Sequence, residues 1–245
     1  MSTILLAVLF FAVATLYGSV GHAGASGYLA VMALVGVAPE RMKPTALALN
    51  VVVAAIATVN FRRAGVFYPK QVAWLAVTSV PMAYLGGTIH PAATWYRPLV
   101  AAVLVVAAAR AVFTVPPAEP RPSEPPRVPA PSALAIGAGI GLLSGLTGTG
   151  GGIFLTPLVV VMGWATVRQS AGLSAPFILV NSIAGLAGSA AAVPTPSADL
   201  AVLVLAAGSG GFLGSHLGAS RLPERPLSIA LALVLVLAAA KLTLT

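Results

Sequence analysis

The sequence has no cysteine and very few charged residues, and both absences narrow the possible functions. Without cysteine the chain forms no disulfide, has no thiol nucleophile and offers no thiolate ligand to a metal. Charged residues make up only 7% of the 245 positions, and 5 of them are acidic. There is no H-E-x-x-H sequence, no Walker A lysine, no nucleophile elbow and no pair of carboxylates within an apolar segment. We therefore expect no enzyme, no ATP-driven pump within this chain and no cofactor.

The apolar content of the chain predicts a polytopic, all-α membrane protein. Hydrophobic residues account for 58% of the sequence, and its mean hydropathy is +0.99. A soluble core could not bury apolar residues spread over almost the whole chain, whereas a lipid bilayer can. The 13 basic residues give a net charge of +8. We attribute most of this charge to the cytoplasmic loops of an inner-membrane protein. Attraction of anions or anionic lipid is the alternative, and nucleic acid is not an expected partner.

Five apolar segments occur in each half of the chain. They cover residues 2–17, 28–38, 45–61, 71–89 and 98–115, then 132–144, a short run ending at Gly163, 167–193, 200–217 and 227–244. No basic region precedes the first run, so we expect it to remain as the first helix rather than act as a cleaved signal. The run 28–38 is too short to cross about 30 Å of hydrocarbon at 1.5 Å per residue. The first two segments of each half therefore either cross fully as a pair or form a re-entrant hairpin.

A proline-rich stretch separates two halves that repeat each other. Residues 116–131 contain eight prolines, a density that excludes helix and favours an extended linker. We predict an N-terminal membrane repeat at 1–115, this linker at 116–131 and a C-terminal membrane repeat at 132–245. A constant offset of 127 positions aligns six residues of the halves: Gly18, Gly21, Gly24, Gly36, Arg41 and Gly87 with Gly145, Gly148, Gly151, Gly163, Arg168 and Gly214. An offset maintained across both halves indicates an internal duplication.

The distribution of basic residues predicts the orientation in the membrane. Arg62, Arg63 and Lys70 form the most basic loop, so we place that loop in the cytoplasm. Counting segments from there puts the N-terminus in the periplasm, and puts the linker and Arg168 in the cytoplasm. The two repeats are then inverted relative to each other, as in many secondary transporters. Arg41 and Arg168 would anchor helix ends or, alternatively, select anions at the two entrances.

Two glycine-rich stretches interrupt the apolar segments at equivalent places. Residues 145–157 contain five glycines, three threonines and a proline, and residues 18–30 are their counterpart. Irregular backbone at this depth must line a cavity or be buried in protein. Short helices beginning near Ala25-Ser26 and at Gly151-Gly152 would present free N–H groups and positive dipole ends, which suit an anion. The predicted substrate site combines both stretches with two polar residues of the third and eighth segments: His22, Gly24, Ala25, Ser26, Asn50, Thr147, Gly148, Thr149, Gly150, Gly151, Gly152 and Asn181.

The polar side chains of the two stretches have distinct predicted roles. Thr147, Thr149 and Ser26 would add hydroxyl donors to the site. His22 is the only ionisable residue of either stretch, and it would contact the anion or carry a coupled proton. A neutral ring bonded to a backbone carbonyl is an equally strong alternative for His22.

For other polar and small residues, a structural role is the alternative to substrate binding. Asn50 and Asn181 would hydrogen-bond substrate or hold helices together. For the scattered glycines Gly137, Gly139 and Gly141 we expect close helix packing instead of a site.

At the two glycine stretches the sequence resembles the sulfite exporter TauE/SafE family, also described as 4-toluene sulfonate uptake permeases. The resemblance rests on G-L-T-G-T-G-G-G-I-F-L-T-P-L-V-V-V-M-G at 145–163 and G-S-V-G-H-A-G-A-S-G-Y-L-A at 18–30. The family pattern is a glycine cluster, an apolar run with proline and a further glycine, repeated in each half of a seven- to eight-helix protein. The first stretch departs from this pattern, with His22 and Ala25 in place of glycines and Ala30 in place of proline. The similarity extends over most of the chain except the linker.

The resemblance implies transport of small sulfur oxyanions or organosulfonates such as sulfite, thiosulfate or sulfoacetate. We expect a secondary transporter, more specifically an exporter, that works by alternating access and is driven by the proton gradient. Its partners would be the anionic substrate, protons and the lipid bilayer. One alternative is an anion channel without coupling. Another is a membrane enzyme or assembly factor, which would need several ionisable residues converging within the membrane.

Overall fold

The computed structural model describes residues 3–90, 92–113, 125–189 and 198–218, together with the single positions 236, 240 and 243. Within these ranges the chain forms helices and no strands. The helices are α1 (Thr3–Ser19), α2 (Ala25–Leu34), α3 (Pro39–Arg63), α4 (Pro69–Thr88), α5 (Ala93–Phe113), α6 (Ala130–Thr147), α7 (Gly152–Val161), α8 (Val167–Gly188) and α9 (Ala198–Gly218). Most of the predicted segment 227–244 and most of the predicted linker lie outside the described residues. The all-helical prediction is confirmed.

The two halves repeat the same local geometry. The short helix α7 begins and ends 127 residues after the short helix α2. Three glycines of each half adopt positive φ at positions that differ by the same offset: Gly21, Gly24 and Gly36, and Gly148, Gly151 and Gly163. Each of these glycines begins or ends an irregular connection, where an L-residue would be strained. The duplication read from the sequence is thus also present in the backbone.

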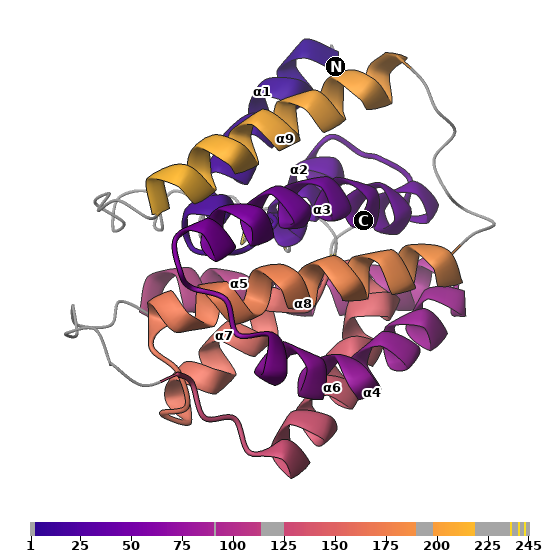
Figure 1. The fold of residues 1–245 in the computed structure, drawn as a ribbon. Coiled ribbons are helices and arrows are strands. Elements are labelled where there is room, and N and C mark those ends of the chain that lie inside the picture. Colours follow the sequence, from indigo (N-terminus) through magenta and orange to yellow (C-terminus); the bar gives the residue numbers. More distant parts are fainter. Residues whose placement is uncertain are drawn as a thin grey trace.

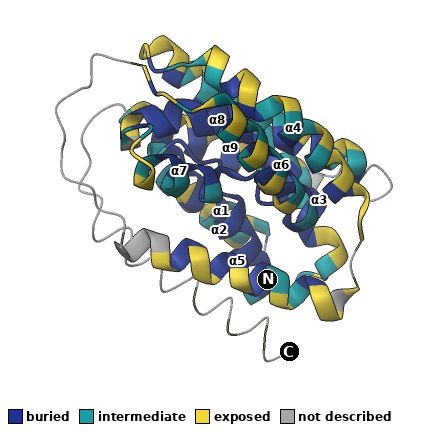
Figure 2. Cartoon of the chain, turned by 90° about the horizontal axis from the view of Figure 1, so that it is seen from below, coloured by how far each residue is buried: buried dark blue, intermediate teal, exposed yellow. Residues whose placement is uncertain are grey.

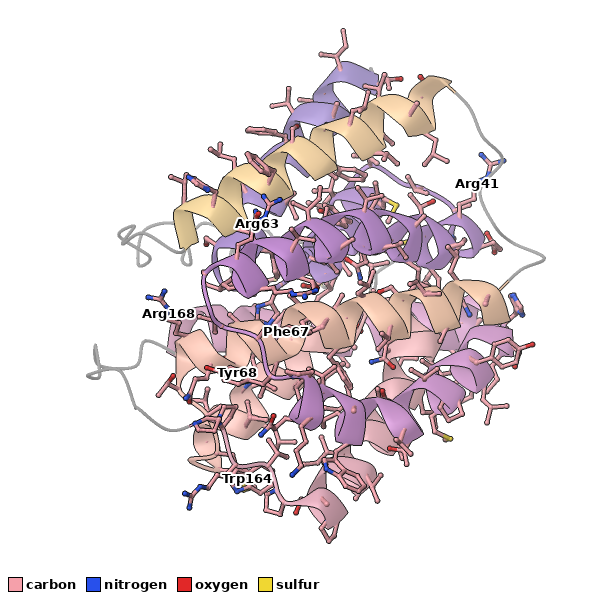
Figure 3. All side chains as sticks on the ribbon, in the orientation of Figure 1. Arg41, Arg63, Phe67, Tyr68, Trp164 and Arg168 are labelled. Carbon is pink, nitrogen blue, oxygen red and sulfur yellow. The ribbon has the colours of Figure 1, made fainter. Side chains whose placement is uncertain are left out.

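The helices pack in pairs that correspond when the halves are exchanged. α4 packs along α6 and α9 packs along α1, so the fourth helix of each half lies on the first helix of the other (Figure 1). The third helices, α3 and α8, pack against each other between these two pairs. Arg41 and Arg168, in the first turns of α3 and α8, lie at opposite ends of the molecule (Figure 3). These observations support the inverted repeat, whereas its orientation in the bilayer stays a prediction.

Small residues allow the paired helices to approach closely. On α6, glycines four residues apart face the backbone carbonyls of α4 one turn after another: Gly137, Gly141 and Gly145 against Leu75, Ser79 and Ala83. In the other pair, α9 places its glycines against carbonyls of α1: Gly210 and Gly214 against Phe11 and Thr15. Any side chain at these glycines would overlap a carbonyl oxygen, so the packing prediction is confirmed for Gly137 and Gly141. It is wrong for Gly139, because nothing lies within 4 Å of the Cβ position there.

The outer surface of the bundle suits a bilayer. Among the described residues, four helices are long and apolar enough to span a membrane: Pro39–Arg63, Ala130–Thr147, Arg168–Gly188 and Asp199–Leu217. α2 and α7, with 10 residues each, reach only about 15 Å, or half of the hydrocarbon core. Large apolar side chains such as Val8, Val77, Trp95 and Leu205 are exposed on the outer faces, and Figure 2 shows exposed residues along α4 and α5 around a buried centre.

Basic and aromatic side chains gather at one end of the bundle. Arg63, Phe67, Tyr68, Trp164 and Arg168 lie there, away from Arg41 (Figure 3). The last residues of the linker reach the same end, where the Arg127 N–H donates to the Trp164 carbonyl at 3.0 Å. This combination is typical of a membrane–water interface on the cytoplasmic side.

Candidate functional site

The two glycine stretches meet at His22, in the connection between α1 and α2. Its Nε2 lies 3.0 Å from the carbonyl oxygen of Gly152, the first residue of α7, and its Nδ1 lies 3.0 Å from the Val20 carbonyl oxygen. A neutral imidazole has one N–H and donates to only one of these oxygens, so both bonds together require the doubly protonated ring. His22 is 3% exposed. A buried, ionisable side chain therefore joins the first stretch to the start of α7.

Both short helices begin without a side-chain cap. The N-cap residue is Gly24 (φ 97°) in α2 and Gly151 (φ 85°) in α7, and neither N-terminus receives a side-chain hydrogen bond. The first turn of a helix leaves N–H groups without intrahelical partners and carries about half a positive charge. By contrast, the neighbouring α8 begins with a complete capping box formed by Thr166 and Gln169. The positive ends of α2 and α7 are thus left uncapped inside the protein.

The hydroxyl groups predicted to contact substrate already have partners. Ser26 Oγ donates to the Tyr17 hydroxyl at 2.7 Å. Thr147 Oγ1 donates to the Leu143 carbonyl at 2.6 Å and lies 2.9 Å from Thr149 Oγ1. Since the single hydroxyl hydrogen of Thr147 is used by Leu143, Thr149 is the donor in the second bond. In this conformation each of the three hydroxyl hydrogens is donated to another group of the protein.

Beside Gly150, in contrast, two buried side chains have polar atoms without a partner. Asn50 is 0% exposed, and neither its Nδ2 nor its Oδ1 makes a hydrogen bond; the same is true of the Oγ of buried Ser182. A Cβ built on Gly150 would lie 2.7 Å from Asn50 Nδ2 and 3.0 Å from Ser182 Oγ, so the backbone passes directly beside both groups. An unmet buried polar group costs about 1–3 kcal/mol. We therefore identify this group, next to the N-terminus of α7, as the candidate binding site.

Asn181 precedes Ser182 in the sequence, but only one of its two polar side-chain atoms lacks a hydrogen-bond partner. Its Nδ2 donates to the Phe177 carbonyl at 2.8 Å, one turn earlier in α8, and only Oδ1 lacks a partner. Ser182 is absent from the predicted site. The sequence signal for it was the pair of polar residues, Asn181 and Ser182, inside an otherwise apolar helix.

The sequence analysis also missed Lys43. Its Nζ donates to the carbonyls of Gly87 (3.0 Å) and Ile89 (2.9 Å) at the end of α4, and the residue is 5% exposed. A Cβ built on Gly148 would lie 3.0–3.1 Å from the carbonyl oxygen, Cα and Cγ of Lys43, so the lysine packs on the second glycine stretch. The signal for it was its spacing of seven residues from Asn50, which places both on one face of α3.

Metal chemistry receives no support from the described residues. They contain no group of three or more His, Asp or Glu side chains that could hold an ion. The polar groups at Gly150 are amides and hydroxyls, which suit hydrogen bonding to a small polar or anionic ligand.

Comparison with known proteins identifies the family. The sequence profile described as "Sulfite exporter TauE/SafE" matches residues 5–242. The chain belongs to the TauE/SafE family. It is 38% identical over 247 aligned residues to the "Probable membrane transporter protein y4hK" of Sinorhizobium fredii (strain NBRC 101917 / NGR234), an alignment that covers 97% of this chain and 96% of the relative. No solved structure matches the TauE/SafE chain significantly.

The family assignment and the helical structure agree. This TauE/SafE protein is a polytopic membrane protein, and both its family and its relative support membrane transport as its function. Within it, the two glycine stretches contact each other as a pair, and each lies beside buried polar groups without a partner: the Tyr28 hydroxyl beside Gly24, and the Asn50 and Ser182 side chains beside Gly150.

Proposed function

We propose that this TauE/SafE protein is a secondary transporter that exports sulfite, or a related small sulfur oxyanion or organosulfonate, across the inner membrane by alternating access. The observation that carries the proposal is the unpartnered Asn50 and Ser182 beside the uncapped N-terminus of α7. Amide and hydroxyl donors next to a helix N-terminus suit the oxygen atoms of an anion. The family name, rather than the site, is the reason for choosing sulfur compounds.

The repeated architecture supports alternating access. Transporters built from inverted repeats bind substrate between the repeats, at broken helices, and open to either side by movement of one part against the other. Here the broken helices α2 and α7 begin where His22 of one half meets Gly152 of the other. A movement between the halves would therefore act directly on the proposed site.

His22 is the proposed link to the proton gradient. Protonation allows its ring to donate to both Val20 and Gly152, whereas loss of a proton removes one of these bonds. The bond to Gly152 is the one that joins the halves, so its presence or absence would change how strongly they are held together. A proton bound at His22 and an anion bound beside Gly150 would then favour different arrangements of the halves.

We place the N-terminus in the periplasm and the linker, with Arg63 and Arg168, in the cytoplasm. The common location of these basic and aromatic side chains at one end supports this orientation. Since the family is one of transporters, we propose no enzymatic activity for the chain.

Flux measurements in proteoliposomes test the proposal. Purified protein should show saturable uptake of sulfite that increases when a proton gradient is imposed, and N50A protein should lose most of it. Sulfate, thiosulfate and sulfoacetate, compared as competitors, identify the preferred anion. Flux that rises linearly with sulfite and ignores the proton gradient would overturn the proposal in favour of an anion channel.

A further inference from the structure

Among the lysine, arginine, aspartate and glutamate side chains that the structure describes, only that of Lys43 is buried. The arginines and the other lysine of that part of the chain are exposed or half-buried where their side chains are placed, and its two acidic residues, Glu40 and Asp199, are exposed. Lys43 is 5% exposed. Burial of an ammonium group is costly unless other groups compensate the charge.

The groups around the Lys43 ammonium compensate its positive charge only in part. Its Nζ donates to the Gly87 and Ile89 carbonyls at the C-terminal end of α4, where the helix dipole amounts to about half a negative charge. Gly87 shares its carbonyl with a second donor, the Ser189 hydroxyl, at 2.9 Å. An ammonium group has three N–H donors, and the two carbonyls use two of them. A net positive charge therefore remains at this point inside the protein.

The residue that carries this charge packs on the second glycine stretch through its backbone and Cγ, and it lies on the same face of α3 as Asn50. Gly148 packs on Lys43, and Gly150, two residues later, packs on Asn50. A separation of seven residues is two turns of helix. The connection between α6 and α7 thus follows α3 from the backbone and Cγ of Lys43 to the free amide of Asn50.

At the first glycine stretch, the position equivalent to Lys43 carries no charge. Gly21, the counterpart of Gly148, packs on Ala171 of α8. The neighbouring Ser170, at the position equivalent to Lys43, is buried and neutral. The two halves therefore share a backbone geometry, but only the first has a lysine at this position of its third helix.

We propose that Lys43 and the second glycine stretch form a cationic subsite that holds one negatively charged oxygen of a small oxyanion. The proposal rests on the proposed function and assigns its charge selectivity to one residue. Asn50 and Ser182 provide neutral hydrogen bonds, while the ammonium group of Lys43 provides the attraction for charge. A neutral molecule of the same shape would not be held at this position.

The test compares variants in sulfite flux and in thermal shift with sulfite. K43M should raise the KM for sulfite at least about tenfold while leaving the maximal rate within about threefold of wild type, and K43R should restore most of the affinity. K70M is the matched control, because it makes the same substitution at an exposed lysine and should leave the KM unchanged. K43Q, whose amide still donates to the α4 carbonyls, keeps the test decisive if K43M does not fold.

The outcomes separate the two proposals. Wild-type protein that shows no sulfite flux and no thermal shift with any of the four sulfur anions would overturn the proposed function. Wild-type flux combined with an unchanged KM in a folded K43M or K43Q protein would overturn the subsite alone. S189A removes the other donor to the Gly87 carbonyl without changing charge. An equal rise in KM for S189A and K43M would show that Lys43 only holds α4 in place, which also overturns the subsite.

Discussion

The two glycine stretches share a backbone but differ in what surrounds it. Both contain a glycine of positive φ, Gly24 or Gly151, that directly precedes a short uncapped helix. Around the first, His22 and Ser26 are bonded within the protein. Around the second, Asn50 has unmet hydrogen-bonding groups. The first stretch thus leaves only the Tyr28 hydroxyl without a partner, whereas the second lies beside an unpartnered amide of α3 and an unpartnered hydroxyl of α8.

This difference suggests that the two halves have different roles in transport. A duplicated fold starts with two equivalent sites, and each can keep or lose its ligand contacts independently. Here the first stretch supplies an ionisable ring that reaches into the second, through the bond from His22 to the Gly152 carbonyl. We infer that anion binding resides in the second half and that its control by protons resides in the first.

The largest effect is expected from filling the second stretch at Gly150. G150A strains the backbone and brings the new methyl group to 2.7 Å from Asn50 Nδ2 and from Ile178. Displacing Asn50 would cost at least one hydrogen bond to a charged ligand, and together with the strain we expect sulfite flux to fall about 100-fold or more.

Gly65 offers a matched control for the backbone strain at Gly150. Both glycines have φ +74°, but nothing lies within 4 Å of the Cβ position at Gly65. G65A should therefore lose about 1–2 kcal/mol of stability, measured by thermal unfolding, and keep its flux. Equal loss of flux in G150A and G65A would mean that backbone strain alone explains the effect, and it would contradict a binding site at Gly150.

Replacing Asn50 by leucine should separate binding from stability. N50L removes two buried polar groups that have no partner, so its unfolding temperature should be unchanged or higher, while flux falls about 10- to 100-fold. N60L is the comparison, because Asn60 Nδ2 donates to the Ser215 hydroxyl at 2.8 Å. That variant should be less stable and transport normally. An N50L protein with normal flux would contradict the site.

The sequence predicted the repeated elements well because they depend on local signals. Glycines at a fixed offset led to the two breaks, and the short helices begin where free N–H groups were expected, at Ala25 and Gly152. The assignment of hydroxyl donors was less informative, since whether Ser26 or Ser182 is free depends on neighbours from other helices. Lys43 was not among the predicted site residues, because its burial depends on contacts with the end of α4.

A change at His22 should affect control by protons more than binding. H22Q can still donate one hydrogen bond, but it cannot take up a proton, so flux should lose its response to an imposed proton gradient. We expect sulfite affinity to stay within about threefold of wild type, because the Asn50 and Ser182 groups are unchanged. Gradient-driven and gradient-free flux in proteoliposomes measure this directly. A fully gradient-dependent H22Q protein would exclude His22 as the coupling residue.

The smallest effect, and the finest comparison of the halves, is expected from two serines. S26A removes a hydroxyl that donates to Tyr17, so it should cost about 1 kcal/mol of stability and change sulfite affinity less than twofold. S182A removes a hydroxyl without a partner beside Gly150, so it should leave stability unchanged and weaken sulfite binding about 3- to 10-fold. Thermal unfolding with and without sulfite measures both quantities in one experiment. If S26A weakened sulfite binding as much as S182A, both stretches would contact the anion. The inference that anion binding resides in the second half would then be wrong.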